Sequence, residues 1–145
     1  MRWVIVADST RCRVFTQELK SGPFEEIDDL VRPSARLREH DRLTDRPGRA
    51  FDSAGAGRHA MERSQKARDG EARKFAHEIV ERLDDARKEN AIDGLVLIAE
   101  PQLLGLVREK LTGPLQKLIE LEIPANLTSA DVETIYARVA DQLRI

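Results

Sequence analysis

Residues 94–111 read GLVLIAEPQLLGLVREKL, and this stretch indicates how the chain folds. Its first six residues are wholly apolar, a pattern typical of a strand that is buried on both faces of a sheet. Pro101 can open a helix at its first turn, leucine and valine then recur at helical spacing, and Gly113-Pro114 is expected to end the helix. We therefore expect a strand over 94–99 followed by a helix that covers the sheet.

The N-terminal part of the chain predicts three further strands joined by turns. Residues 3–7, WVIVA, are again wholly apolar, and Asp8 begins a turn. Apolar and polar side chains alternate from Cys12 to Gln17, which favours a β-hairpin with the first strand. A third strand is expected over 24–31, after the turn formed by Ser21-Gly22-Pro23.

The segments on either side of residues 94–111 predict more helices and one more strand. Apolar residues from about Ser64 to Glu89 recur every three or four positions, and Asn90 is expected to stop this helix. Residues 118–123, LIELEI, alternate like a strand, and Thr128 or Ser129 is expected to cap a last helix. The order β-β-β-loop-α-β-α-β-α predicts an α/β fold, a mixed sheet of about five strands covered by helices.

Composition indicates one soluble domain over residues 1–145 without disulfides. Hydrophobic residues make up 41% of the chain and aromatic residues 4%, so the core must be mainly aliphatic. Cys12 stands alone, which excludes an intramolecular disulfide and a multi-cysteine zinc site, and it is expected to pack as a small hydrophobe. No apolar run approaches about 18 residues, and no export signal is recognised, so we expect a cytoplasmic protein that does not enter membranes.

The stretch from Arg32 to Gln65 has no hydrophobic periodicity and is expected to form a long Arg-rich loop over about 32–63. Between residues 32 and 63 it holds eight arginines and no lysine against five acidic residues, a formal excess of three positive charges. Loops longer than about 12–15 residues are uncommon inside compact domains and are usually functional or disordered. The net charge of the chain is −2, so the remainder is acidic and this loop is the basic part.

Several motifs, in collinear order along the chain, resemble the bacterial host attachment protein family, "protein required for attachment to host cells". These are WVIVADSTRCRVF, REHDRLTDRPGRAFDS, GAGRHA, EARKFAHEIVERL and LVLIAEPQLLGLVREKL. That family is similar to the middle domain of archaeal and eukaryotic peptide-chain release factors. The resemblance implies a ribonuclease H-like fold and contact with the ribosome or tRNA.

Release factors of that kind carry a Gly-Gly-Gln tip on a long loop that precedes a long helix. The resemblance places this tip at Gly55-Ala56-Gly57-Arg58-His59 of the present chain. Arg58 replaces a glycine and His59 replaces the glutamine, so the release mechanism is not carried over to this chain.

Arginine and glycine residues of the loop are candidates for binding RNA phosphate. The planar guanidinium fork suits phosphate oxygens, and glycine allows a ligand to approach the backbone closely. The candidates are Arg42, Arg46, Arg49, Gly55, Gly57 and Arg58. The alternative is that these arginines pair with neighbouring acids and hold the loop on the domain.

Two candidate sites for chemistry remain open. His59 could act as a general base, because its ordinary pKa of about 6.5 suits proton transfer, or could stack on a nucleobase. Asp8, Asp45 and Asp52 could form an acidic cluster that holds Mg²⁺, as in nucleases of the ribonuclease H type. The favoured interpretation of Asp8 is a turn-forming residue that caps the backbone of residues 9–11. No metal or cofactor is assigned.

The sequence thus leaves three functions. The first is an RNA- or ribosome-interacting protein that uses the Arg-rich loop. The second is a hydrolase, either a peptidyl-tRNA hydrolase that uses His59 or a metal-dependent nuclease that uses Asp8. The third is a non-catalytic interaction module, which could bind another copy of itself and be linked only indirectly to attachment.

Overall fold

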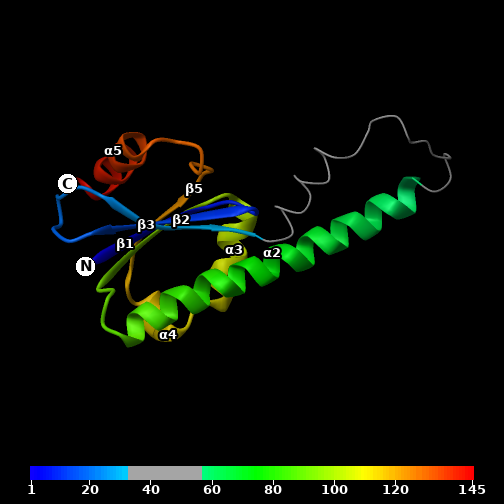
Figure 1. The fold of residues 1–145 in the computed structure, drawn as a ribbon, viewed down its shortest axis with the longest axis horizontal. Coiled ribbons are helices and arrows are strands. Elements are labelled where there is room, and N and C mark those ends of the chain that lie inside the picture. Colours follow the sequence, from blue (N-terminus) through cyan, green and yellow to red (C-terminus); the bar gives the residue numbers. More distant parts are fainter. Residues whose placement is uncertain (33–56) are drawn as a thin grey trace.

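One mixed sheet with helices on both faces organises the chain (Figure 1). The computed structural model describes residues 1–32 and 57–145, and after the gap it describes side chains from residue 65. The elements are β1 (Arg2–Ala7), β2 (Arg11–Gln17), β3 (Glu25–Val31), α2 (Gly57–Lys88), β4 (Gly94–Ala99), α3 (Pro101–Lys110), α4 (Gly113–Gln116), β5 (Ile119–Pro124) and α5 (Val132–Leu143).

The strand order is β3-β2-β1-β4-β5, with β1 in the centre. β1 pairs antiparallel with β2, and β2 pairs antiparallel with β3. On the other side β1 pairs parallel with β4, and β4 pairs parallel with β5. Every residue of β1 and β4 is buried, as their continuous apolar sequences predict. The expected five-stranded mixed sheet is confirmed.

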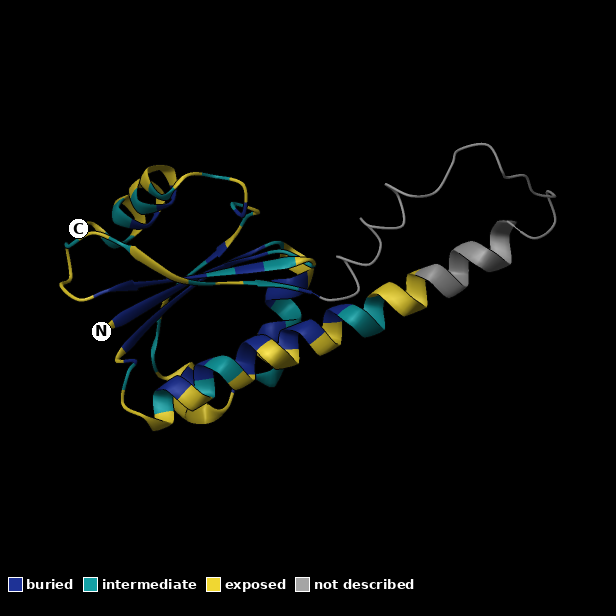
Figure 2. Ribbon diagram, viewed as in Figure 1, coloured by how far each residue is buried: buried dark blue, intermediate teal, exposed yellow. Residues whose placement is uncertain are grey.

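Side chains of the central strands alternate between two cores. Trp3 and Ile5 of β1 point to the face that α2, α3 and α4 cover, and Val4 and Val6 point to the face that α5 covers. Figure 2 shows buried residues filling the central strands and the side of α2 that meets the sheet. Cys12 is 1% exposed within the first core, so its expected role as a small hydrophobe is confirmed.

The helix α2 begins earlier than the sequence predicts. The expected loop over about 32–63 is wrong for residues 57–63, which belong to α2. Residues 57–68, GRHAMERSQKAR, are mostly good helix formers, but they carry no apolar stripe. Because apolar periodicity is the main sign of a helix in a sequence, a helical segment that meets no core escapes detection.

Two other boundaries differ from the prediction for local reasons. The N-cap of α5 is Asp131, whose carboxylate accepts a hydrogen bond from the Thr134 backbone N–H at 2.8 Å, and neither Thr128 nor Ser129 has this role. Gly113 and Pro114 do follow the end of α3, but they also begin the one-turn helix α4. Asn90 ends α2 as expected, with a left-handed φ of 59°.

Candidate nucleic-acid interface

The N-terminal part of α2 extends beyond the sheet (Figure 1). Ala72 is the first described residue of the helix that is buried, and residues 65–68 are all exposed (Figure 2). At 1.5 Å per residue, the helix from Gly57 to Glu71 is roughly 22 Å long. We call residues 57–71 the α2 arm. Helices gain most of their stability from packing, so the buried half of α2, from Ala72 onward, supports the arm.

The base of the arm is tied to the sheet and to α3. Arg32 follows β3 and donates its backbone N–H to the Thr10 carbonyl at 2.9 Å. Its buried guanidinium lies 3.5 Å from the Glu71 carboxylate, and its Nε has no hydrogen-bond partner among the described residues. On the α3 side, Gln102 donates to the Asp69 carboxylate at 3.4 Å. These contacts fix the place where the arm leaves the body of the protein.

Asp8 lies just after β1, at the carboxyl ends of the parallel strands. Its Oδ1 accepts hydrogen bonds from the backbone N–H groups of Thr10 and Arg11 at 2.8 and 2.9 Å, and its Oδ2 accepts one from the Thr128 hydroxyl at 2.8 Å. Burial opposes ionisation, but the hydrogen bonds from Thr10, Thr128 and Arg11 outweigh it and lower the pKa of Asp8. The interpretation of Asp8 as a turn-forming residue is confirmed.

Arginines beside Asp8 hold the connection between β5 and α5 on the sheet. Arg13 donates to the carbonyls of Thr128 and Ala130 at 3.1 and 2.7 Å, and its guanidinium pairs with Glu26 at 2.9 Å. Arg11 pairs with Asp29 of β3 at 2.8 Å. These guanidinium groups are therefore engaged within the fold, and phosphate would have to compete with carboxylates for them.

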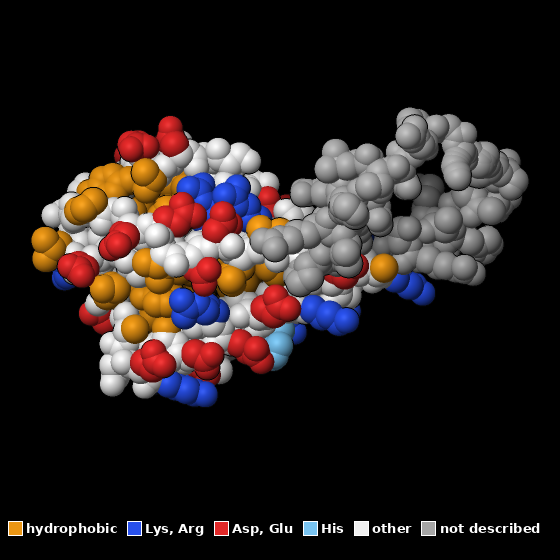
Figure 3. Space-filling model, in the orientation of Figure 1, with side chains coloured by type: hydrophobic (Ala, Val, Ile, Leu, Met, Phe, Trp, Pro, Cys, Tyr) orange, Lys and Arg blue, Asp and Glu red, His pale blue; other side chains and the backbone are white. Residues whose placement is uncertain are grey.

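Cations on the arm are in a different situation. Lys66 and Arg68 are exposed, and neither forms an ion pair or hydrogen bond with another described residue. Figure 3 shows Lys and Arg side chains along α2 toward its N-terminal end. The sequence interpretation placed both residues in the helix expected from about Ser64, outside the Arg-rich loop of about 32–63, and therefore did not consider them as phosphate-binding candidates. Unpaired exposed cations are the groups that can bind an anion without breaking an existing ion pair.

Most of the predicted site residues lie outside the described residues. These are Arg42, Arg46, Arg49, Gly55, Asp45 and Asp52. The backbone of α2 places Gly57, Arg58 and His59 in its first turn, at the far end of the arm (Figure 1). Asp8, by contrast, lies at the end of β1 in the sheet. Among the side chains of residues 1–32 and 65–145, no group of three His, Cys, Asp or Glu residues is arranged to hold a metal ion.

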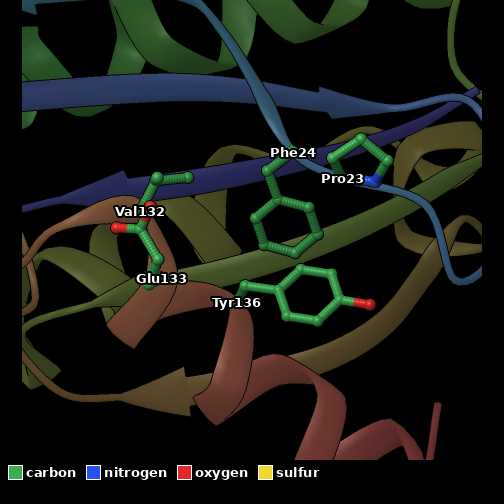
Figure 4. A pocket seen from close by; sticks show the side chains of 5 residues that line it. All are labelled: Pro23, Phe24, Val132, Glu133 and Tyr136. Carbon is green, nitrogen blue, oxygen red and sulfur yellow. The ribbon is translucent and has the colours of Figure 1, made fainter.

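An apolar hollow of about 390 Å³ opens beside α5, on the face of the sheet opposite α2 (Figure 4). The rings of Phe24 and Tyr136 meet edge-on with centroids 5.0 Å apart, and Pro23, Val132 and Glu133 complete the lining. The Tyr136 hydroxyl donates to the Ser21 carbonyl at 3.0 Å, which ties α5 to the turn before β3. Among the described residues that line this hollow, Glu133 is the carboxylate and the other side chains are mainly apolar.

A family model described as "Protein required for attachment to host cells" matches residues 3–139. The chain belongs to this family. The chain is also similar to the crystal structure of the archaeal translation termination factor aRF1, at 13% identity and a TM-score of 0.45 over 99% of this chain. A second structure, described as an archaeal protein, matches at 12% identity with the same TM-score and the same 99% share of this chain.

The chain spans 38% of the length of each of those two structures. No curated protein matches it. In the described part of the chain, no helix is long and apolar enough to cross a membrane.

Proposed function

We propose that this protein binds RNA, on or near the ribosome, through the α2 arm and the Arg-rich segment that precedes it. The observation that carries the proposal is the contrast in pairing between the sheet and the arm. Arg2, Arg11 and Arg13 on the strands are paired with carboxylates, whereas Lys66 and Arg68 on the arm have no partner among the described residues. Free cations on an exposed helix suit the phosphate backbone of RNA.

The far end of the arm adds a second source of attraction for phosphate. The first backbone N–H groups of a helix have no intrahelical partner, and the helix dipole places partial positive charge there. The first turn of α2 contains no acidic residue that would cancel this charge. Gly57 and Arg58 belong to this turn, and Arg42, Arg46, Arg49 and Gly55 precede it in the sequence. We assign phosphate binding to these six residues.

His59 follows them in the first turn of α2. An imidazole near bound RNA can stack on an unpaired nucleobase, which is a common mode of single-strand recognition. We assign this stacking role to His59. General-base catalysis by His59 would require, in addition, a group that positions a substrate within hydrogen-bond distance of its imidazole.

Sedimentation of the purified protein with ribosomes, together with anisotropy of a labelled single-stranded RNA, tests the proposal. We expect binding at low salt that weakens steeply as salt rises, with a slope of about 0.7 per neutralised phosphate in a plot of log K against log salt. Substituting Arg42, Arg46 and Arg49 by Ala is expected to weaken binding and flatten this slope.

A matched control replaces exposed cations elsewhere on the protein. Arg138 of α5, Lys20 of the turn after β2 and Lys117 after α4 are exposed, and their side chains form no ion pair with a described residue, so replacing all three by Ala removes as much charge as the loop variant. Their Ala variants are expected to bind like the wild type. Absence of binding by the wild type at low salt would overturn the proposal. Retention of a partner from nuclease-treated lysate, without RNA binding, would favour the protein-interaction alternative.

A further inference from the structure

A second basic surface lies on the body of the protein, where α2 passes the end of α3. It is a hollow of about 370 Å³ lined by Arg73, Lys74, His77, Glu78 and Lys110. Three lining residues carry fixed positive charge, one is a histidine and one is a carboxylate. We call it the α2–α3 hollow.

Two helices that run in the same direction build this hollow. Gln102, near the start of α3, reaches Asp69 of α2, and Lys110, the last residue of α3, lies beside the turn of α2 that contains Lys74 and His77. Phe75, Ala76 and Ile79 point from this turn into the core, so Arg73, Lys74 and His77 face outward.

The cations of the hollow are not neutralised within the described structure. Arg73, Lys74 and Lys110 form no ion pair or hydrogen bond with a described residue, although Glu78 is close by. His77 is paired, with its Nε2 2.8 Å from the Glu81 carboxylate. Lys88 farther along the same helix pairs with Asp84 at 3.4 Å, so lysines on α2 do find partners where a carboxylate is placed for them. The hollow therefore keeps a net positive charge.

Gly70 connects the hollow with the arm. Lys66, Gly70, Arg73 and His77 follow one another at intervals of four, three and four residues, so they lie on one face of α2. A glycine inside a helix costs about 1 kcal/mol of stability relative to alanine. Apart from the backbone of the helix itself, no atom of a described residue lies within 4 Å of the position that a Cβ on Gly70 would take, so the described packing does not require a glycine here. A bare backbone between two cations allows a ligand to lie directly against the helix.

From this we infer that the α2–α3 hollow binds backbone phosphate of a single RNA strand that runs along α2 over Gly70 from the arm. The inference rests on the proposed function and extends it from the arm to the body of the protein. RNA is favoured over a single small anion because the cations extend along the helix, from Lys66 to Lys74 over roughly 12 Å. A flexible chain of phosphates can meet all of them.

The test measures binding of a labelled oligouridylate by anisotropy as a function of salt. The variant replaces Arg73, Lys74 and Lys110 by Ala, and the control replaces Lys20, Lys117 and Arg138, three exposed cations outside the hollow, by Ala. Both change the net charge equally. For three lost phosphate contacts we expect the salt slope to fall by about 2 and the affinity near 0.1 M salt to fall by about 10- to 100-fold. The control is expected to bind like the wild type.

A second variant separates close approach from charge. Gly70→Ala should raise the melting temperature and, if RNA lies against the helix, weaken binding at the same time. Gly105→Ala on α3, where a Cβ also meets no atom within 4 Å, should raise the melting temperature and leave binding unchanged.

The outcomes distinguish the two proposals. If the wild type binds RNA and the two triple variants lose affinity equally, or neither loses any, the hollow is not a binding site. The proposal that the arm binds RNA would then stand. Wild-type protein that ignores oligouridylate but binds anionic vesicles or polyglutamate would overturn both, because its partner would then be a membrane or an acidic protein.

Discussion

At the scale of single residues, the Arg2 ion pair depends on a glycine in a neighbouring strand. Arg2 is buried, and it donates to Glu120 through Nε and Nη2 at 3.1 and 2.9 Å and to Gln17 at 2.6 Å. A Cβ at Gly94 would overlap the Glu120 carboxylate. Gly94 thus leaves the space in which Glu120 reaches across β4 to Arg2.

We predict that Gly94→Ala lowers the free energy of unfolding by about 1–3 kcal/mol, because it displaces the carboxylate that satisfies a buried guanidinium. Urea denaturation of the variant measures this loss. The same substitution in a Glu120→Ala background should cost much less, since the displaced partner is already gone. An equal cost in both backgrounds would contradict the account.

Asp8 predicts a dependence of stability on pH. Because its hydrogen bonds lower its folded pKa below the unfolded value of about 3.9, Asp8 stabilises the fold above that pH, and the contribution is lost as pH falls through the folded pKa. We expect Asp8→Asn to cost about 1–3 kcal/mol at pH 7 and progressively less below pH about 4. Unfolding free energies of both proteins measured from pH 7 to pH 3 check this, and a constant difference would be inconsistent with it.

At the scale of elements, α2 consists of two halves with different support. Residues of α2 from Ala72 onward contribute Phe75, Ile79 and Leu83 to the core, whereas no described side chain of α2 before Ala72 is buried. Amide protection follows the support that tertiary packing gives a helix.

We therefore predict that backbone amides of the arm exchange with solvent much faster than those of residues 75–88. Hydrogen exchange followed by mass spectrometry measures both segments in one experiment. Addition of RNA should slow exchange in the arm and leave the core strands unchanged. Equal protection along the whole of α2 without RNA would show that something else supports the arm.

The same division explains how far the sequence predicts the elements. Strands β1 and β4 are predictable because a wholly apolar run needs burial on both faces. The first part of the arm, residues 57–63, is not, because it carries no apolar periodicity. Asp131 caps α5 in place of the expected Thr128, whose hydroxyl donates instead to Asp8, a contact between residues 120 positions apart. Such a contact depends on the sheet topology and cannot be deduced from neighbouring residues.

At the scale of the whole molecule, the core between the sheet and the helices α2, α3 and α4 encloses the thiol of Cys12. Burial raises the pKa of this thiol far above its ordinary value, with nearby Asp28, Asp29 and Asp8 adding to the effect. A neutral buried thiol is a poor nucleophile.

We predict that Cys12 resists alkylating reagents in the native protein and reacts when the sheet opens as a unit. Labelling rates across a urea series should follow the global unfolding equilibrium measured by circular dichroism. Fast labelling in native buffer would show that β2 opens independently of the remaining sheet.

The projecting part of α2 also determines how far the protein extends from the sheet. A helix advances by a fixed 1.5 Å per residue and repeats its face about every seven residues, so removing residues 62–68 would retract the far end by about 10 Å and leave its orientation nearly unchanged. Of the removed residues, the described ones, 65–68, are all exposed, and Asp69 and Glu71 would keep their contacts with Gln102 and Arg32. The distance between the sheet and the first turn of α2 can therefore change while the fold of the sheet is kept. The position of a partner bound at that first turn would change by the same distance.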